Sequence, residues 1–297
     1  MNTTLLYFKK GSRPAKKLAK SLNIESKMIN CHHFPDGESL ITLPEKLSKR
    51  VIIYTSLNKP NNRLIELLFA AKGARKLGAK NLILVAPYMC YMRQDKTFLP
   101  GQVVSQQIIG EYLGDLFDFI ITVDAHLHRV QNIKEIFPKC EAINLSASSE
   151  IAKFLSKLDE RATLIGPDEE SLQWVKKIAK ACGLNFGVCK KNRLGDKAVE
   201  IEIPKIDLSS IEKVILIDDI ISSGKTAAVS AKMLKKAGAK KIDCIVTHAV
   251  FAKGAQKILK EAGIDKIITT DSIPHRSNKI ELAPVLSEAI YKILGQC

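Results

Sequence analysis

Several features that are common in proteins are scarce in this sequence, and each shortage excludes a class of protein. Seven cysteines are scattered along 297 residues without a C-x-x-C pair, and their number is odd. A zinc ribbon or a disulfide framework is therefore not expected, and a reducing cytoplasm fits the pattern. No apolar run approaches the roughly 18–20 residues of a membrane span. The N-terminal basic residues follow a short apolar run, the reverse of the order in a signal peptide. We expect a soluble, cytoplasmic protein that uses no membrane.

Aromatic residues make up only 6% of the chain, although its formal net charge is +15. A protein that binds single-stranded nucleic acid usually interleaves aromatic rings with its basic residues. Here paired lysines such as Lys176-Lys177 and Lys235-Lys236 recur on amphipathic helical patterns along the whole chain. We interpret them as solvated helix faces that help to attract anionic small substrates. No nucleic-acid partner is expected.

Short apolar, β-branched runs alternate with helical patterns throughout the sequence. Strands are expected at residues 51–55, 82–86, 119–123, 163–165, 214–217, 243–247 and 266–270, and helices at 64–77, 104–113, 171–182, 226–237 and 255–262. Continuous apolar strands that alternate with helices are typical of mainly parallel sheets covered by helices on both faces. The fold class is therefore α/β.

The two halves of the chain resemble each other. RKLGAKNLILVAPY, starting at Arg75, aligns with KKAGAKKIDCIVTHA, starting at Lys235, and in both a glycine ends a helix before a strand. FDFIITVDAH aligns with IDKIITTDSI further along, and the first half carries extra residues near 93–102. We predict two similar domains, 1–142 and 143–297. An insertion at the carboxyl end of a strand is where α/β folds bind ligands.

The segment VILIDDIISSGKT, residues 214–226, joins an expected strand to an expected helix. Asp218 and Asp219 stand at the end of the strand, and Gly224 lies in a hydroxyl-rich loop before the helix. Such a loop offers backbone N–H groups to a phosphate, assisted by the helix dipole, and the carboxylates can accept hydrogen bonds from ribose hydroxyls. A Walker A loop is excluded, because that motif requires glycine at position 219.

This segment resembles the phosphoribosyl-diphosphate motif of the type I phosphoribosyltransferase fold. Four further segments resemble ribose-phosphate diphosphokinase, also called phosphoribosyl pyrophosphate synthetase, and they occur in the order found in that family. They are FPDGE from Phe34, APYMCYMRQDKTFLPGQ from Ala86, ITVDAH from Ile121 and GPDEE from Gly166. The sequence is closer to the archaeal-type members. The resemblance implies two phosphoribosyltransferase-like domains.

The resemblance also implies which residues bind each substrate. ATP-binding residues would be Phe34, Asp36, Gly37, Glu38, Arg93 and Gln94, with the Phe34 loop reaching the ATP site of a neighbouring subunit. Ribose 5-phosphate-binding residues would be Arg193, Asp218, Asp219, Ser222, Ser223, Gly224, Lys225 and Thr226. Lys225 is unusual for the family and occurs at this place in purine salvage transferases. Without the resemblance, the alternative for Arg93 is a salt bridge to Asp95.

Catalytic and metal positions follow from the same resemblance. Lys191 and Arg193 fall on the catalytic Lys-x-Arg of the family's flexible loop, with Lys190 as the alternative for the lysine. His126 and Asp168 fall on metal positions, and the metal would be Mg²⁺. His128 is interpreted as structural. The adjacent His32 and His33 would point apart in an extended segment, so neither is interpreted as a ligand.

The activity implied is transfer of the diphosphoryl group of ATP to the C1 hydroxyl of ribose 5-phosphate, giving phosphoribosyl diphosphate and AMP. A site shared between subunits implies a homo-oligomer, at least a dimer. One alternative is a phosphoribosyltransferase, which would leave Arg93 and Gln94 unexplained. Another is a non-catalytic regulatory homologue, which would be expected to have lost Lys191, Arg193 or His126. All three are present.

Overall fold

The computed structural model describes residues 3–97, 99–127, 129–130, 132–158, 162–194, 198–204 and 211–296, with backbone only at 191–194, 198–202 and 296. The chain forms two compact units, each with its own sheet. Unit 1 comprises Met1–Ser146 and Leu282–Cys297, and unit 2 comprises Ala147–Glu281. Across the part of the chain described, no helix combines the length and apolar character that a membrane span needs.

Unit 1 is built on a seven-stranded sheet with the strand order β3-β2-β1-β4-β5-β6-β7. Every strand pair is parallel except β2 and β3. Its strands are β1 (Thr3–Phe8), β2 (Glu25–His33), β3 (Ser39–Thr42), β4 (Arg50–Tyr54), β5 (Asn81–Val85), β6 (Phe119–Val123) and β7 (Glu141–Leu145). Its helices are η1 (Lys9–Gly11), α1 (Ser12–Leu22), α2 (Pro60–Lys76), α3 (Ser105–Gly114), η2 (Ile133–Glu135) and α8 (Ala283–Gln296).

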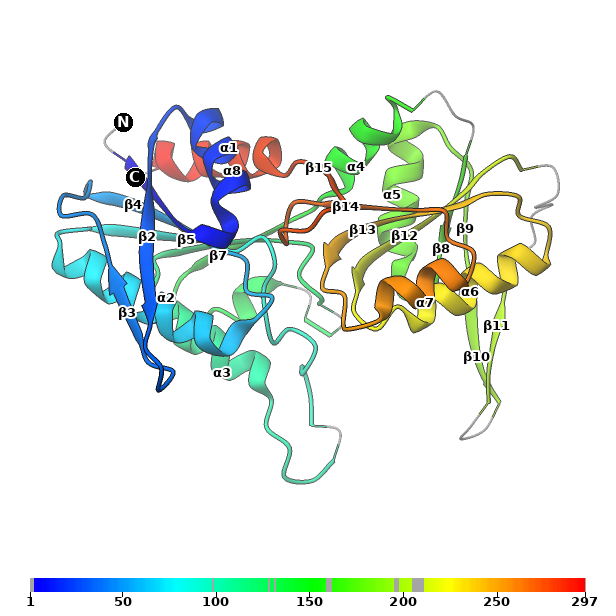
Figure 1. Ribbon diagram of the computed structural model, residues 1–297, viewed down its shortest axis with the longest axis horizontal. Coiled ribbons are helices and arrows are strands. Elements are labelled where there is room, and N and C mark those ends of the chain that lie inside the picture. Colours follow the sequence, from blue (N-terminus) through cyan, green and yellow to red (C-terminus); the bar gives the residue numbers. More distant parts are fainter. Residues whose placement is uncertain are drawn as a thin grey trace. The chain divides into compact units, whose positions relative to one another are not determined.

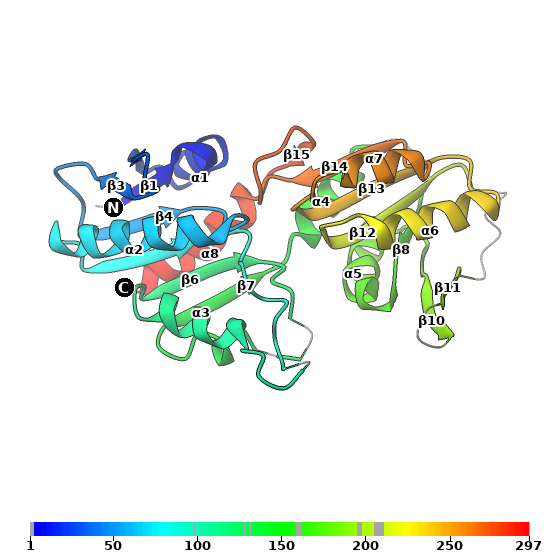
Figure 2. The same ribbon diagram turned by 60° about the horizontal axis from the view of Figure 1, so that its bottom comes forward.

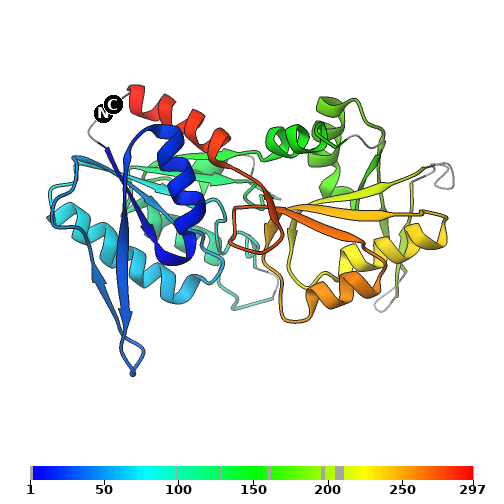
Figure 3. The ribbon, with the colours of Figure 1, turned by 45° about the horizontal axis from the view of Figure 1, so that its top comes forward.

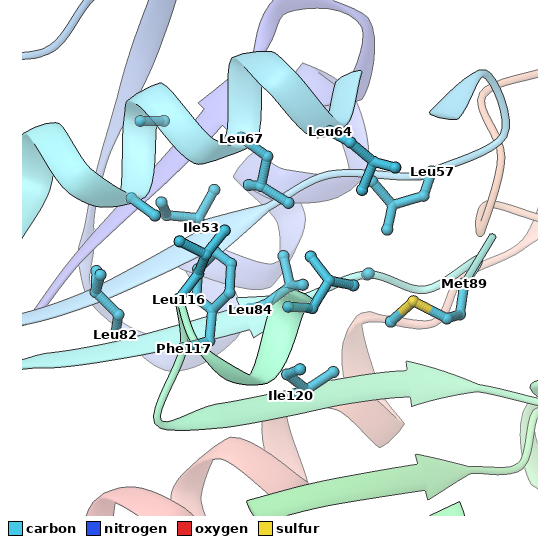
Figure 4. Packing of buried hydrophobic residues seen from close by; sticks show 14 of the residues in the cluster. Ile53, Leu57, Leu64, Leu67, Leu82, Leu84, Met89, Leu116, Phe117 and Ile120 are labelled. Carbon is cyan, nitrogen blue, oxygen red and sulfur yellow. The ribbon is translucent and has the colours of Figure 1, made fainter. Parts of the chain in front are cut away.

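Helices cover both faces of this sheet. Helices α2 and α3 lie on one face, and α1 and α8 lie together on the other (Figure 1). Leu64 and Leu67 of α2 point onto Ile53 and Leu84 of the sheet (Figure 4), and all four are 7% exposed or less. Burial on both faces explains why the strands are continuous apolar runs.

Unit 2 has a six-stranded sheet with the order β15-β14-β13-β12-β8-β9 and a separate ribbon, β10-β11. Its strands are β8 (Thr163–Gly166), β9 (Phe186–Val188), β10 (Lys190–Leu194), β11 (Ala198–Glu202), β12 (Val214–Ile221), β13 (Ile242–Ala249), β14 (Lys266–Thr270) and β15 (Asn278–Ile280). Its helices are α4 (Ser148–Leu155), η3 (Glu169–Ser171), α5 (Leu172–Cys182), α6 (Lys225–Lys236) and α7 (Ala255–Glu261). Helices α6 and α7 cover one face and α5 the other (Figure 2).

The internal repeat is visible in equivalent contacts of the two units. The glycines that end α2 and α6, Gly78 and Gly238, both adopt positive φ, at 95° and 101°. In unit 1, the Asp118 carboxylate accepts hydrogen bonds from Arg75 of α2 and, at 2.7 Å, from the N–H of Leu82 in β5. In unit 2, Asp265 accepts from the first N–H of β13 at 2.9 Å. Lys235 of α6 also lies 3.9 Å from Asp265, so carboxylates at equivalent positions contact a helix and a strand in both halves.

The C-terminal helix departs from the predicted division at residue 143. Helix α8 packs against α1 in unit 1 (Figure 3). The Tyr291 hydroxyl donates to the carbonyl of Ser21 at 3.1 Å. Leu286, Ile290 and Ile293 are at most 3% exposed. The chain therefore returns to unit 1 after β15, because α8 has an apolar face that α1 and the first sheet cover. Unit 2 ends at Glu281 instead of continuing to residue 297.

Candidate functional site

Three acidic residues of unit 2, Asp168, Asp218 and Asp219, lie near the carboxyl ends of strands β8 and β12. These strands are parallel neighbours, with Ile165 opposite Leu216. Asp168 follows β8 and caps η3, its carboxylate accepting from the N–H of Ser171 at 3.3 Å. Strand β12 does not end before Asp218 as expected but continues through Ile221, because residues up to that point still pair with β13.

The three carboxylates of Asp168, Asp218 and Asp219 interact electrostatically. Burial, followed by the negative charges of Asp219 and Asp168, raises the pKa of Asp218 well above its usual range. Burial also raises the pKa of Asp168, with further contributions from Glu170 and Asp219. Ionised carboxylates that repel one another are stabilised by a divalent cation or by donated hydroxyl hydrogen bonds. Their oxygens are the ligands that Mg²⁺ prefers, so this donor set fits that ion.

The loop after β12 presents the start of helix α6. Gly224, at φ 77°, precedes the helix without a side-chain cap. A Cβ here would lie 3.2 Å from Leu259 Cγ and 3.3 Å from the Ala255 carbonyl oxygen, so the close approach of α7 also requires glycine. Among the described residues, no acceptor is found for the N–H groups of Thr226 and Ala227. These N–H groups at a helix N-terminus can bind a phosphate.

Hydrogen bonds hold the same loop in place. The Ser222 carbonyl accepts from the N–H of Ala252 at 2.9 Å. The Ser223 hydroxyl accepts from the N–H of Lys225 at 3.4 Å. The side chains of Ser223 and Lys225 are exposed, and Thr226 is half-buried. The hydroxyls of Ser223 and Thr226 and the ammonium group of Lys225 therefore border the start of α6.

Lys191 and Arg193 lie in strand β10 and not in an irregular loop. They pair with Ile201 and Val199 of the antiparallel strand β11. Alternate residues of a strand share a face, so the two positions lie on one face of the ribbon. Strand β9 ends at Val188 and β10 begins at Lys190, so the chain passes from one strand to the next with a single residue between them. Residues 195–197, between the strands, lie outside the described residues, as does His128.

The FPDGE segment forms the tip of the β2-β3 hairpin, which extends away from the sheet (Figure 3). The Phe34 N–H donates to the Glu38 carbonyl at 2.9 Å, and the Asp36 carboxylate accepts from the Glu38 N–H at 3.0 Å. Gly37 has φ 95°. The whole tip is exposed, including 42% of Phe34. An exposed aromatic ring on a closed turn is suited to contact a partner or a ligand.

Arg93 and Gln94 lie in the long segment between β5 and α3. In the described part of the chain, Arg93 is exposed and makes no hydrogen bond or ion pair. The expected alternative, a salt bridge between Arg93 and Asp95, is not formed, because Asp95 accepts from Arg129 at 2.9 Å. Gln106 was missed by sequence reasoning. It is 2% exposed, and its amide donates to the Met92 carbonyl at 3.1 Å, which fixes the segment beside Arg93. Its signal was a polar side chain on the buried face of a helix.

His126 follows β6 in unit 1, whereas Asp168 belongs to unit 2. The turn before it is well fixed. The N–H of Asp124, at φ 39°, donates to the Leu145 carbonyl, and that of Ala125 donates to the Asn144 side chain at 2.9 Å. His126 is half-buried. The ATP-type residues thus all lie in unit 1, and the ribose phosphate-type residues in unit 2.

Two α/β units with matching strand order, one with an acid pair and a glycine turn before a helix, are typical of enzymes that act on phosphorylated ribose. Two family models match the chain. They describe the N-terminal domain of ribose phosphate pyrophosphokinase, at residues 4–116, and a phosphoribosyl synthetase-associated domain, at residues 207–296.

Relatives that match this chain over almost their whole length indicate the same family. The chain is 32% identical over 288 residues to a ribose-phosphate pyrophosphokinase of Methanopyrus kandleri, covering 96% of this chain and 97% of that protein. It is 34% identical over 276 residues to ribose-phosphate pyrophosphokinase 2 of Archaeoglobus fulgidus, covering 93% and 96%. This chain belongs to the ribose-phosphate pyrophosphokinase family. The predicted closeness to archaeal members is confirmed.

The fold has a counterpart among solved structures. The phosphoribosylpyrophosphate synthetase from Mycobacterium smegmatis superimposes with a TM-score of 0.85 and 22% identity, and the match covers 100% of both chains. The predicted α/β architecture with two phosphoribosyltransferase-like units is therefore confirmed.

Proposed function

We propose that this protein transfers the β,γ-diphosphoryl group of ATP to the C1 hydroxyl of ribose 5-phosphate. The products are phosphoribosyl diphosphate and AMP. The P–O bond between the α- and β-phosphates breaks, the C1 oxygen bonds to the β-phosphorus, and the hydroxyl proton is released. Family membership supports the reaction, and the geometry of unit 2 supports the acceptor site.

One observation carries the acceptor assignment. In unit 2, the carboxylates of Asp218 and Asp219 in β12 interact with that of Asp168, which follows β8, and helix α6 begins shortly after β12. A sugar phosphate is suited to both parts at once. Its phosphate would accept hydrogen bonds from the N–H groups of Thr226 and Ala227. Its hydroxyls would donate hydrogen bonds to the carboxylates.

In unit 1, Arg93 and Gln94 bind ATP, with the guanidinium on the phosphates. Phe34, Asp36, Gly37 and Glu38 bind the ATP of a neighbouring subunit, so the active protein is a homo-oligomer, at least a dimer. His126 and Asp168 would be ligands for a divalent metal, Mg²⁺, which would neutralise charge on the ATP phosphates when bound. The reaction belongs in the cytoplasm, where both substrates occur.

Lys191 and Arg193 stabilise the transferring group. Negative charge on the phosphoryl oxygens must be met by fixed or recruited cations in phosphoryl transfer. The two positions are on one face of β10, so both can approach the same group. Arg193 also contacts ribose 5-phosphate in this assignment.

The Lys191→Ala variant tests these roles. We expect its turnover to fall at least about a hundredfold, because a charge-stabilising donor is lost, while ribose 5-phosphate affinity stays nearly unchanged. Lys190→Ala is the matched control, and it should retain activity. If Lys190→Ala is inactive and Lys191→Ala is active, the catalytic lysine has been assigned one position too far along.

Substrate choice distinguishes this proposal from the alternatives. Wild-type protein with Mg²⁺, ATP and ribose 5-phosphate should release AMP. Release of pyrophosphate from phosphoribosyl diphosphate on addition of a nucleobase would instead indicate a phosphoribosyltransferase. Folded protein that binds both substrates and yields no AMP would indicate a regulatory homologue.

A further inference from the structure

A cluster of three side chains in unit 1, Cys31, His33 and Glu66, lies outside the residues assigned to the reaction. Their potential ligand atoms all lie within 4.8 Å of one another. The Cys31 thiol donates to Glu66 Oε1 at 3.2 Å, His33 Nε2 lies 2.7 Å from the same oxygen, and Sγ and Nε2 are 3.5 Å apart. Cys31 Sγ, His33 Nε2 and Glu66 Oε1 therefore lie close enough to bind one metal ion together.

Strand and helix geometry explain why these residues meet. Cys31 and His33 are two apart in β2, so their side chains lie on the same face of the strand, while His32 lies on the other. The His32 ring instead contacts Phe34, with centroids 4.8 Å apart. Glu66 reaches the cluster from α2. The two histidines do point apart, as the sequence predicts, but this separation places His33 next to Cys31 and does not exclude a ligand role.

We propose that Cys31, His33 and Glu66 form a binding site for a Zn²⁺-class transition metal ion. In tetrahedral Zn²⁺ coordination, with a sulfur at about 2.3 Å and a nitrogen or oxygen at about 2.1 Å, the ligand atoms are about 3.4–3.6 Å apart. The Sγ–Nε2 separation already matches, and the two contacts to Oε1 need to lengthen by less than about 1 Å. Mg²⁺ is disfavoured, because it prefers oxygen ligands.

The carboxylate is prepared for this role by its surroundings. Glu66 is only 3% exposed, and a buried acid on a helix needs partners. Arg63 occupies its other oxygen, with Nη1 at 2.7 Å from Oε2. The guanidinium is itself held over the Phe8 ring, 4.0 Å from the centroid. Such outer contacts orient a ligating carboxylate and leave Oε1 for the metal.

The cluster also has an open side. The His33 side chain is 56% exposed, so an ion can enter from solvent, and water can take the fourth position. Charges balance as well. A Cys31 thiolate and ionised Glu66 offset the two charges of the ion, and Arg63 remains paired with Oε2.

Metal binding at this site must displace a proton. The Cys31 thiol donates its hydrogen to Glu66 Oε1 at 3.2 Å. A bound transition metal takes the thiolate, so binding releases this proton and strengthens as the pH rises.

Metal binding at Cys31, His33 and Glu66 is independent of the proposed reaction and can be measured without an activity assay. Full-length protein is titrated with Co²⁺, whose bond to a thiolate gives a charge-transfer absorption band and whose visible bands report coordination geometry. We expect one equivalent of Co²⁺ to produce the charge-transfer band and four-coordinate visible bands, with displacement by Zn²⁺ and not by Mg²⁺. No charge-transfer band at saturating Co²⁺ overturns the proposal.

Variants assign the band to this cluster. Cys31→Ser should abolish the charge-transfer band, and His33→Asn should weaken Co²⁺ affinity by about a hundredfold. His32→Asn and Cys182→Ser are the matched controls and should leave binding unchanged. Zn²⁺ should also protect Cys31 of the wild-type protein from alkylation, a readout that does not depend on folding of a variant. An unprotected Cys31, or a band retained in folded Cys31→Ser, contradicts the site.

Discussion

Asp218, which we propose to bind ribose 5-phosphate, opposes the stability of its own fold. Burial and two neighbouring carboxylates raise its pKa. A carboxyl group whose pKa is raised in the native state favours the protonated form there. Its destabilising effect is therefore absent below the ordinary pKa of the unfolded chain, grows as pH rises toward the native pKa, and persists above it. Neutral pH lies above the ordinary pKa of the unfolded chain, so there the raised pKa of Asp218 lowers the free energy of unfolding.

The Asp218→Asn variant should separate stability from binding. Loss of the charge relieves repulsion, so its melting temperature should exceed that of the wild type at neutral pH, and the gain should disappear at acid pH. Its ribose 5-phosphate affinity should fall by at least about tenfold, because a charged hydrogen-bond acceptor is lost. Thermal unfolding across a pH series and calorimetric titration measure both effects. Glu261→Gln, at an exposed acid in the same unit, should change neither, and a lower melting temperature for Asp218→Asn would contradict the account.

At the residue scale, local arrangements can be predicted from sequence better than contacts between distant segments. The motif at residues 214–226 predicts an acid pair followed by a glycine-containing turn and a helix, and the structure has this order, because these parts are adjacent in sequence. It did not reveal that Asp168 interacts with Asp218, nor that Cys31 meets Glu66. Both contacts join distant segments, and only the packing of strands and helices brings them together.

Among the secondary-structure elements, helix α6 begins after a glycine that is constrained both by its backbone conformation and by its neighbours. Gly224 combines positive φ with a close approach to α7. Gly183, which ends α5 at φ 67°, has nothing within 4 Å of an added Cβ. An alanine at either position adopts a left-handed conformation at a cost of roughly 1–2 kcal/mol, but only at Gly224 does it also collide with neighbours.

The two glycine variants therefore form a matched pair. Gly224→Ala should lower the free energy of unfolding by more than Gly183→Ala does, and it alone should weaken ribose 5-phosphate binding, since it displaces the start of α6. Denaturant unfolding and ligand titration compare them. Equal destabilisation, with binding intact in both variants, would show that the loop tolerates a side chain and that the phosphate assignment is wrong.

The predicted elements were most accurate where pattern and packing agree. The expected strands at 119–123 and 266–270 coincide with β6 and β14. Strand β12 is longer than expected, since acidic residues do not prevent a strand from pairing with β13. The expected loop at Lys191 is instead strand β10, because pairing with β11 outweighs the weak strand preference of its charged residues.

At the scale of the whole molecule, chain order and structural units differ. The repeat predicted two similar halves, and the parallel sheets confirm them, but helix α8 returns to unit 1. Sequence could not show this, because an amphipathic helix at the end of a chain does not specify which sheet covers it. Two separate segments therefore stabilise unit 1, whereas unit 2 is continuous.

An Ile290→Ala substitution tests this division. Ile290 is 0% exposed in α8, so truncation should cost about 2–5 kcal/mol. Hydrogen exchange of the full-length variant should show lost protection in the strands of unit 1 and unchanged protection in β12–β14. Lys292→Ala, whose side chain is 71% exposed, should leave both units protected. Loss confined to unit 2 would contradict the assignment of α8.

The central claim is that this chain makes phosphoribosyl diphosphate by moving two phosphates together. Phosphorus NMR of the wild-type protein with ATP, ribose 5-phosphate and Mg²⁺ tests it most directly, because each product phosphate has its own resonance. We predict that the resonances of AMP and of a C1 diphosphate ester grow in equal amounts as those of ATP decline. Formation of ADP with a singly phosphorylated C1, or ATP that remains unchanged in the presence of folded protein, would contradict the account.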